Sequence, residues 1–172
     1  KRTGASVDDD IYVTGTLGDA AQGLALVRTG EEAGYLVDRY EFPEPRIEAG
    51  RLLRGLATSS IDISDGLVSE ISHLTEVSTL GADIQASSIP LSTDLVKSVG
   101  QTVARRLALF SGDDYELCFT AKENDLEAIK AVSKQIGLPM TRIGKINGNG
   151  QIGVHDEHGE LIDLPVSGYE HF

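Results

Sequence analysis

Tryptophan is absent from this sequence, and cysteine occurs once, at Cys118. A single cysteine cannot form a disulfide within the chain, so a reducing, cytoplasmic setting is expected. Long apolar runs are also lacking. No stretch approaches the roughly 18 apolar residues that a membrane-spanning helix needs, and no segment has the pattern of a signal peptide. The sequence therefore indicates no membrane association.

Basic residues are scarce relative to acidic ones. The chain has 15 lysine and arginine residues against 27 aspartate and glutamate residues, which gives a net charge of −12. This balance argues against a nucleic-acid partner, because binding to phosphate backbones depends on lysine and arginine. An acidic surface usually serves solubility alone. It indicates a site only where carboxylates gather so that a divalent cation could bridge them to an anionic ligand.

An initiator methionine is missing too, because the chain begins KRTGASVDDD, in what reads as the middle of a loop. We therefore expect a piece of a longer protein, or a processed one. Its 172 residues, 40% of them hydrophobic, are enough for one well-buried globular domain. No internal repeat, low-complexity segment or linker divides them, so one domain is expected.

Strand-like and helix-like patterns alternate along the chain. β-Branched and aromatic runs predict strands at 11–15, 58–64, 82–86, within 111–121, at 140–146 and at 151–157. Apolar spacings of three and four residues predict helices from Asp19, as the N-cap, and at 46–57, 66–79, 102–110 and 123–137. The letters NGNG between the last two strands predict a hairpin turn. The pattern as a whole predicts an α/β (α+β mixed) fold, a layered mixed sheet with helices.

The segment SSIDISDGL carries the first acidic turn. In an alternating strand, Ile61 and Ile63 point to one face and Asp62 and Ser64 to the other, and Asp65 follows at the strand's end. Two carboxylates so close repel each other unless a cation or a shared proton intervenes. Aspartate oxygens completed by phosphate oxygens are how Mg²⁺ is held in phosphoryl-transfer sites. The alternative is that Ser64 or Asp65 merely caps the following helix.

The segment SGDDYEL carries the second acidic turn. Gly112 allows the backbone to bend, and Asp113 and Asp114 come at the entry of the next strand. Glu116 is unusual inside an apolar strand, because a buried carboxylate is costly without a partner. The alternative is an ordinary turn with exposed acids.

Two other patterns are interpreted as structural. The glycine-rich GTLGDAAQG matches neither the Walker pattern nor G-x-G-x-x-G, and Asp19 would place negative charge where a phosphate should lie. His155 and His158 stand three apart in the expected hairpin with no third type of ligand nearby, so a zinc site is not favoured.

Taken together and in this order, KRTGA, IYVTGTLGDAAQGLAL, SSIDISDGL, SGDDYELCFT and the terminal GYEHF resemble the thiamine-monophosphate kinase family. That family belongs to the ATP-binding superfamily that also contains aminoimidazole ribonucleotide synthetase and selenophosphate synthetase. The resemblance covers the whole chain but only the family's C-terminal domain. It implies that residues 1–172 are the single C-terminal domain of a two-domain kinase, with an aminoimidazole ribonucleotide synthetase-like C-terminal fold. The N-terminal domain, which dimerises and holds much of the ATP and magnesium site, would be absent.

The resemblance also implies an activity, the Mg²⁺-dependent transfer of phosphate from ATP to thiamine monophosphate to give thiamine diphosphate. The full-length protein would be a homodimer, and the isolated chain would be inactive or very feeble. Matched by position, the implied contacts are Asp62 and Asp65 to magnesium, Arg2 and Ser64 to ATP, and Asp113 and Tyr169 to the thiamine substrate. Asp113 stands where the family often has glutamate. The aspartate side chain is shorter, so the geometry of its contact with the substrate would differ.

Two alternatives remain open. One is another enzyme of the same superfamily, against which the GDDYELCFT and GYEHF segments argue. The other is a non-catalytic ligand-binding or interaction domain. In that case Asp62 and Asp65 could be changed to asparagine with little consequence for the binding of a partner.

Overall fold

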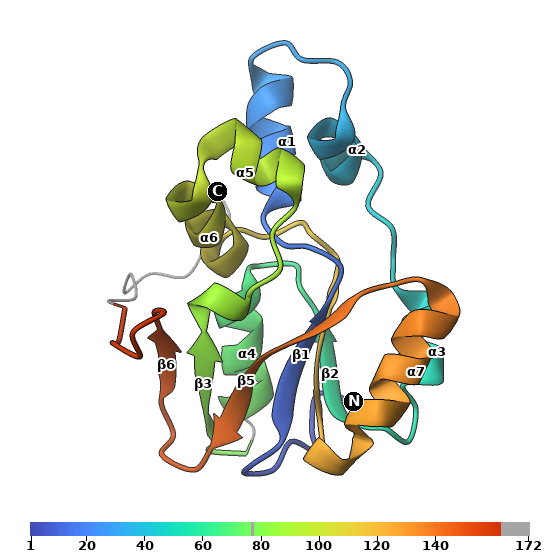
Figure 1. Cartoon of the computed structure of the whole chain (residues 1–172), viewed down its shortest axis with the longest axis vertical. Coiled ribbons are helices and arrows are strands. Elements are labelled where there is room, and N and C mark those ends of the chain that lie inside the picture. The colour runs from blue at the N-terminus through green and yellow to red at the C-terminus, as the bar shows by residue number, and fades with distance from the viewer. Residues whose placement is uncertain (77, 163–172) are drawn as a thin grey trace.

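Six strands form one mixed sheet in the computed structural model, which describes residues 1–76 and 78–162 (Figure 1). The strands are β1 (Asp10–Thr14), β2 (Ala57–Asp62), β3 (Gly81–Gln85), β4 (Leu117–Ala121), β5 (Met140–Asn147) and β6 (Ile152–His155). Their order is β2-β4-β1-β5-β3-β6. Neighbouring strands are antiparallel except for β3 and β6, which are parallel. The predicted mixed sheet is therefore confirmed.

Helices cover both faces of this sheet and one of its ends. They are α1 (Asp19–Arg28), α2 (Tyr35–Glu41), α3 (Ile47–Leu52), α4 (Leu67–Glu76), α5 (Thr93–Val99), α6 (Gln101–Phe110) and α7 (Leu126–Ile136). One face contacts α4, and the other is covered by α7, which also packs against α3. Helices α1, α2 and α5 gather beyond the end of β1, at the top of Figure 1. Within the described residues, no helix combines the length and apolar character needed to cross a bilayer.

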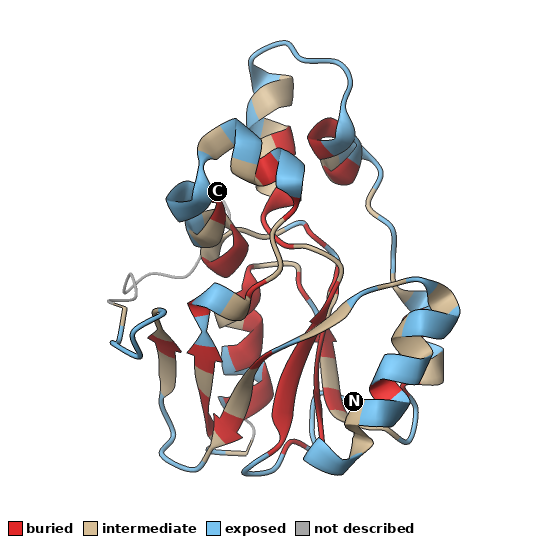
Figure 2. Ribbon diagram, viewed as in Figure 1, coloured by how far each residue is buried: buried red, intermediate tan, exposed pale blue. Residues whose placement is uncertain are grey.

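The strand alternation divides the core into two layers. Ile11 and Val13 of β1 point into the cluster beneath α4, whereas Tyr12 between them points to the opposite face. There Tyr12 stacks on Phe119 of β4, with ring centroids 5.2 Å apart, and Ile129 of α7 covers the pair. Burying each such side chain stabilises the fold by roughly 1.5–3 kcal/mol. Figure 2 shows buried residues concentrated in the central strands and in the helix faces that pack against them.

The hairpin predicted for the last two strands is wrong. β5 and β6 do not pair with each other, because β3 lies between them and bonds to both. Asn147 and Asn149 do form tight side-chain turns, accepting hydrogen bonds from the amides of Asn149 and Gln151. The turn chemistry was therefore interpreted correctly. However, Ala82 and Ile84 of β3 are fully buried. Their burial favours an interior position for β3, between β5 and β6.

The N-cap predicted at Asp19 is also wrong, by one residue. Gly18 occupies that position with φ of 85°, and Asp19 is the first residue of α1. The Asp19 carboxylate is fully buried and accepts hydrogen bonds from Ser92 Oγ at 2.5 Å and Tyr35 Oη at 3.2 Å. It ties α1 to the segments that carry α2 and α5, so its role is tertiary.

Candidate functional site

The two acidic turns lie side by side, because β2 and β4 are neighbours in the sheet. Their pairing continues past the strand ends. The amide of Ile63 donates to the Glu116 carbonyl at 2.8 Å, and the amide of Tyr115 donates to the Ile63 carbonyl at 3.0 Å. The amide of Asp113 then donates to the Ser64 carbonyl at 2.9 Å. The structure thus brings together two segments that are about fifty residues apart in the sequence.

Glycines allow this close approach. A Cβ built on Gly112 would overlap the carbonyl oxygen of Ser64. Gly66, with φ of 104°, has the backbone of Phe110 within 3.0 Å of where its Cβ would stand. A side chain at Gly112 would therefore push the first turn away from the second, and one at Gly66 would push it away from the end of α6.

The first turn presents its acids outward and its apolar residues inward. Ile61 and Ile63 are buried, whereas Asp62 is exposed and Asp65 is half-buried. The predicted alternation is thus confirmed. Among the described residues, none forms a hydrogen bond or ion pair with the Asp62 carboxylate. The hydroxyl of Ser64 donates to Glu70 Oε1 at 3.0 Å.

The second turn holds its two aspartates in opposite environments. Asp113 is exposed with φ of 69°, and Tyr115 is 37% exposed with φ of 51°. Asp114 between them is fully buried. Left-handed backbone at non-glycine residues costs free energy, and it persists only where surrounding contacts impose it. The expectation of exposed acids is therefore right for Asp113 and wrong for Asp114.

The buried Asp114 supplies those contacts. Its carboxylate accepts hydrogen bonds from the amides of Gly18 at 2.7 Å and Ala20 at 3.2 Å, at the start of α1. Burial raises the pKa of Asp114 to about 7, against the lowering effect of the two amides. This internal carboxylate occupies the N-terminus of α1, so the glycine-rich segment before that helix is structural, as the sequence indicated.

Glu116 has the partners that its burial requires. Arg39 donates to it at 2.9 Å, Arg46 donates through Nε and Nη2 at 2.8 and 2.7 Å, and Thr14 Oγ1 donates at 2.6 Å. A Cβ on Gly15 would overlap the carboxylate. The hydrogen bonds that Arg46 donates to Glu116, together with the charge of Glu116, raise the pKa of Arg46 above its ordinary value. Two buried salt bridges thus anchor β4 to α2 and to the start of α3.

Sequence reasoning missed Arg39, Arg46 and Glu70. Arg39 lies on α2, an element that the patterns did not predict. Arg46 follows two prolines, where the pattern predicted only the start of a helix. Glu70 had a usable signal, because it stands on the buried stripe of α4 beside Ile71.

The other two candidate site residues, Arg2 and Tyr169, are less closely tied to the acidic turns. Residues 1–4 run along the free edge of β2, where the Ser60 amide donates to the Lys1 carbonyl at 2.8 Å, and Arg2 is exposed there. Tyr169 lies outside the described residues.

Among the described residues, the histidine pair does not form a metal site. His155 bonds to Asp83 at 3.2 Å. Residues 1–76 and 78–162 contain no group of three or more histidine, cysteine, aspartate or glutamate residues that could hold a metal.

The donor set of the first turn fits part of a magnesium site. Mg²⁺ is usually held by one or two carboxylates, with water and phosphate oxygens as its other ligands. Asp62 and Asp65 could supply two such carboxylates at an exposed edge of the sheet. The remaining ligands must come from the other molecules bound or from another domain.

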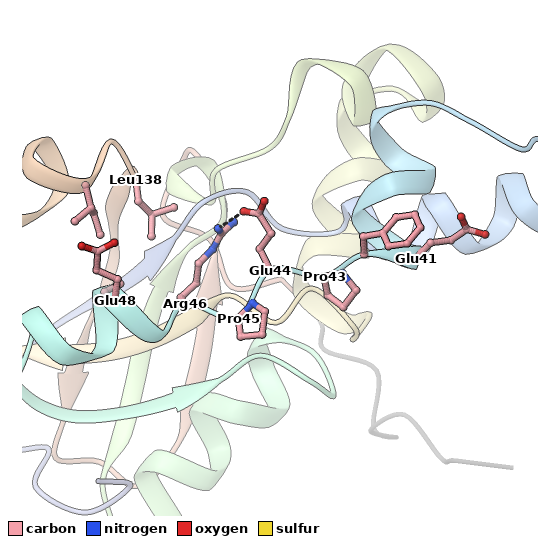
Figure 3. Close-up of a pocket in the computed structure, with 10 residues that line it drawn as sticks. Glu41, Pro43, Glu44, Pro45, Arg46, Glu48 and Leu138 are labelled. Carbon is pink, nitrogen blue, oxygen red and sulfur yellow. Dashed lines mark hydrogen bonds and ion pairs between the residues drawn. The ribbon is translucent and has the colours of Figure 1, made fainter.

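A separate pocket of about 800 Å³ lies between the α2–α3 connection and the end of α7 (Figure 3). Among the described residues that line it, Arg46 alone is basic, and it is already paired with Glu116 and with Glu44 at 2.9 Å. Glu41 and Glu48 add negative charge. This pocket therefore does not suit an anionic ligand, and the acidic turns remain the candidate site.

Comparison with known proteins identifies the domain. The family model described as AIR synthase related protein, C-terminal domain, matches residues 6–157. The chain belongs to this family. The AIR synthase-related C-terminal domain is the fold that the sequence predicted.

Its relatives include thiamine-monophosphate kinases. The chain is 41% identical to the Escherichia coli K12 enzyme over 177 residues, which is 99% of the chain and 54% of that protein. A crystal structure of thiamine-monophosphate kinase from Stenotrophomonas maltophilia K279a is 40% identical, with a TM-score of 0.85 over 94% of the chain and 54% of that structure. A third relative, described as AaThiL complexed with AMPPCP and TMP, is 31% identical, with a TM-score of 0.79 over 99% and 53%. The chain spans about half the length of the curated relatives it matches.

Proposed function

We propose that this chain supplies the C-terminal part of a thiamine-monophosphate kinase. In the reaction, a phosphate oxygen of thiamine monophosphate attacks the γ-phosphorus of ATP. The bond to the β–γ bridging oxygen breaks, and ADP and thiamine diphosphate form. The relatives bearing that name, and the one complexed with AMPPCP and TMP, support this proposal. The observation that carries it is the meeting of the two acidic turns, with Asp62 and Asp113 exposed at the same edge of the sheet.

Charge explains why acidic turns suit this reaction. Both ligands are anionic, and phosphoryl transfer depends chiefly on positioning and on neutralising charge. Bound Mg²⁺ would neutralise the phosphates, and Asp62 and Asp65 are the residues of this chain that would hold it. The attacking phosphate is already ionised, so neither aspartate needs to act as a general base.

The other site residues are assigned on the same proposal. Ser64 lies in the first acidic turn, and Arg2 lies along the free edge of β2. Both are assigned as ATP contacts on the resemblance. Asp113 faces outward from the adjoining turn as the contact to thiamine monophosphate. Tyr169 is kept as a substrate contact on the resemblance alone.

The proposed magnesium site needs ligands from a second domain. Two carboxylates hold only part of a magnesium shell, so the site would be shared with an N-terminal domain that dimerises in the full-length protein. Residues 1–172 would form the C-terminal domain, inactive by itself. Because the reaction draws on ATP, the cytoplasm is the proposed setting.

The test is formation of thiamine diphosphate from ATP, Mg²⁺ and thiamine monophosphate. It compares the 172-residue chain with a full-length protein carrying the N-terminal domain. Product from the long form alone is expected. Product from neither form would refute the substrate assignment, and product from the short chain would refute the shared site.

A further inference from the structure

Glu70 is a buried carboxylate beneath the first acidic turn. It stands in the first turn of α4 and is 3% exposed, on the same helix face as Leu67 and Ile71. An acidic side chain at such a core position is costly unless it is hydrogen-bonded. The identity of its partners therefore indicates what it does.

Its hydrogen-bond donors, Ser64 and Asp65, both belong to the first acidic turn. Glu70 Oε1 accepts the hydroxyl of Ser64 at 3.0 Å and the backbone amide of Asp65 at 3.2 Å. The two hydrogen bonds reach from the helix back over the turn that precedes it. They fix the peptide from which the Asp65 side chain projects, and they fix the rotamer of Ser64.

The bond to Glu70 also decides what Ser64 can offer a ligand. A serine hydroxyl has one proton and two lone pairs. Since the proton is directed to Glu70, only lone pairs remain for the side that faces the ligand. Unprotonated phosphate oxygens carry no hydrogen to donate to them, whereas a metal cation or its bound water can use them.

We infer that Glu70 is a positioning residue, which orients Asp65 and Ser64 so that the turn presents only oxygen lone pairs and selects a hydrated divalent cation. The inference rests on the proposed function for the identity of that cation. It also refines the role of Ser64, whose contact with ATP would run through the cation and its water.

Two substitutions separate hydrogen bonding from packing. Glu70→Gln removes the charge but keeps an acceptor oxygen, whereas Glu70→Met keeps the length and removes the acceptor. Thr75→Val is the matched control, because Thr75 is buried on the same helix and its hydroxyl donates to the carbonyls of Ile71 and Ser72, outside the acidic turn.

The experiment measures Mn²⁺ binding to the full-length protein by electron paramagnetic resonance, with no ATP or phosphoryl acceptor present. The site of interest is the one that Asp62→Asn removes. Exchange of the Asp65 amide with solvent is followed by nuclear magnetic resonance in the same proteins. We expect Glu70→Met to weaken Mn²⁺ binding about 10-fold or more and to speed Asp65 exchange, as loss of a residue supporting a metal ligand does. Glu70→Gln and Thr75→Val should stay close to wild type in both.

Three outcomes would overturn the inference, and a fourth would overturn only the proposed function. Wild-type Mn²⁺ affinity in Glu70→Met would show that the turn is positioned without Glu70. Equal weakening in Glu70→Gln would show that charge, not the acceptor oxygen, matters. No Mn²⁺ site lost in Asp62→Asn would remove the inference together with the metal assignment. A Glu70-sensitive Mn²⁺ site in a protein that makes no thiamine diphosphate would refute the proposed function alone.

Discussion

The backbone amide of Asp113 donates a hydrogen bond to the carbonyl of Ser64 at 2.9 Å. This bond joins the turn proposed to hold the metal to the turn proposed to contact the substrate. Because it is a backbone contact, it depends on how closely the two backbone segments approach and not on either side chain. The geometry of the site can therefore be tested at the glycine that allows that approach.

Gly112→Ala should disrupt the site and the fold together. The added methyl group would overlap the Ser64 carbonyl, and a backbone atom cannot move aside without shifting β2. We expect a loss of stability of about 1–3 kcal/mol and a loss of kinase activity in the full-length protein. Gly50→Ala is the control, because its new Cβ would meet only Leu117 Cδ1 at 3.7 Å and helix α3 would be favoured. Equal melting temperatures for the two variants would contradict the close approach.

Stability should fall as pH rises between about 4 and 7, through Asp114. Burial raises the pKa of its carboxyl to about 7 in the folded chain, whereas an unfolded aspartate titrates near 3.9. Between these values the folded state holds a proton that the unfolded state has lost, so raising the pH favours unfolding. Urea titrations at several pH values should show this fall, and Asp114→Asn should flatten it. An unchanged slope in the variant would assign the effect to another group.

Removing Arg39 should destabilise the chain far more than removing a surface lysine. Arg39→Met would leave Glu116, which is fully buried, with Arg46 as its remaining cationic partner. The expected cost is about 3 kcal/mol. Lys130→Met, which breaks an exposed pair with Glu127, should cost less than about 1 kcal/mol. Chemical denaturation measures both, and a cost for Arg39→Met no larger than the control would contradict the buried salt bridge.

Cys118 should be unreactive in the folded chain. Its thiol is fully buried in β4, and burial, with a further contribution from the charge of Glu70, raises its pKa to about 12. A thiolate is the reactive form, so a disulfide reagent at pH 8 should label Cys118 only after denaturation. Rapid labelling of the native protein would show that β4 is accessible.

Local patterns predicted the elements better than the contacts between them. The helix at Leu126–Ile136 ends at Gly137, as its sequence indicated, and the alternation of Ile61, Asp62 and Ile63 was interpreted correctly. The pairing of β5 with β6 was not, because an Asn-Gly turn says where a chain bends but not which strand enters beside it.

The site residues show the same difference between local patterns, which were predicted, and long-range contacts, which were not. Glu116 could be recognised as needing a partner, since an acid inside an apolar strand is unusual, but Arg39 and Arg46 are about seventy residues away and no local pattern links them. Asp114 and Asp113 are adjacent in the sequence, yet one is buried and the other exposed. Their separation depends on a left-handed backbone that the start of α1 imposes from a distance.

The assignment of Asp62 as a metal ligand is tested most sharply by the Mg²⁺-dependent turnover of Asp62→Asn in the full-length protein. Asp62 is exposed, so the substitution should leave the fold intact. Glu127→Gln, which removes an exposed charge on α7, is the control. We expect Asp62→Asn to lower thiamine diphosphate formation by about 100-fold or more at wild-type stability, because a ligand of the cation is lost. Turnover close to that of the control would contradict the assignment of the first acidic turn to the metal.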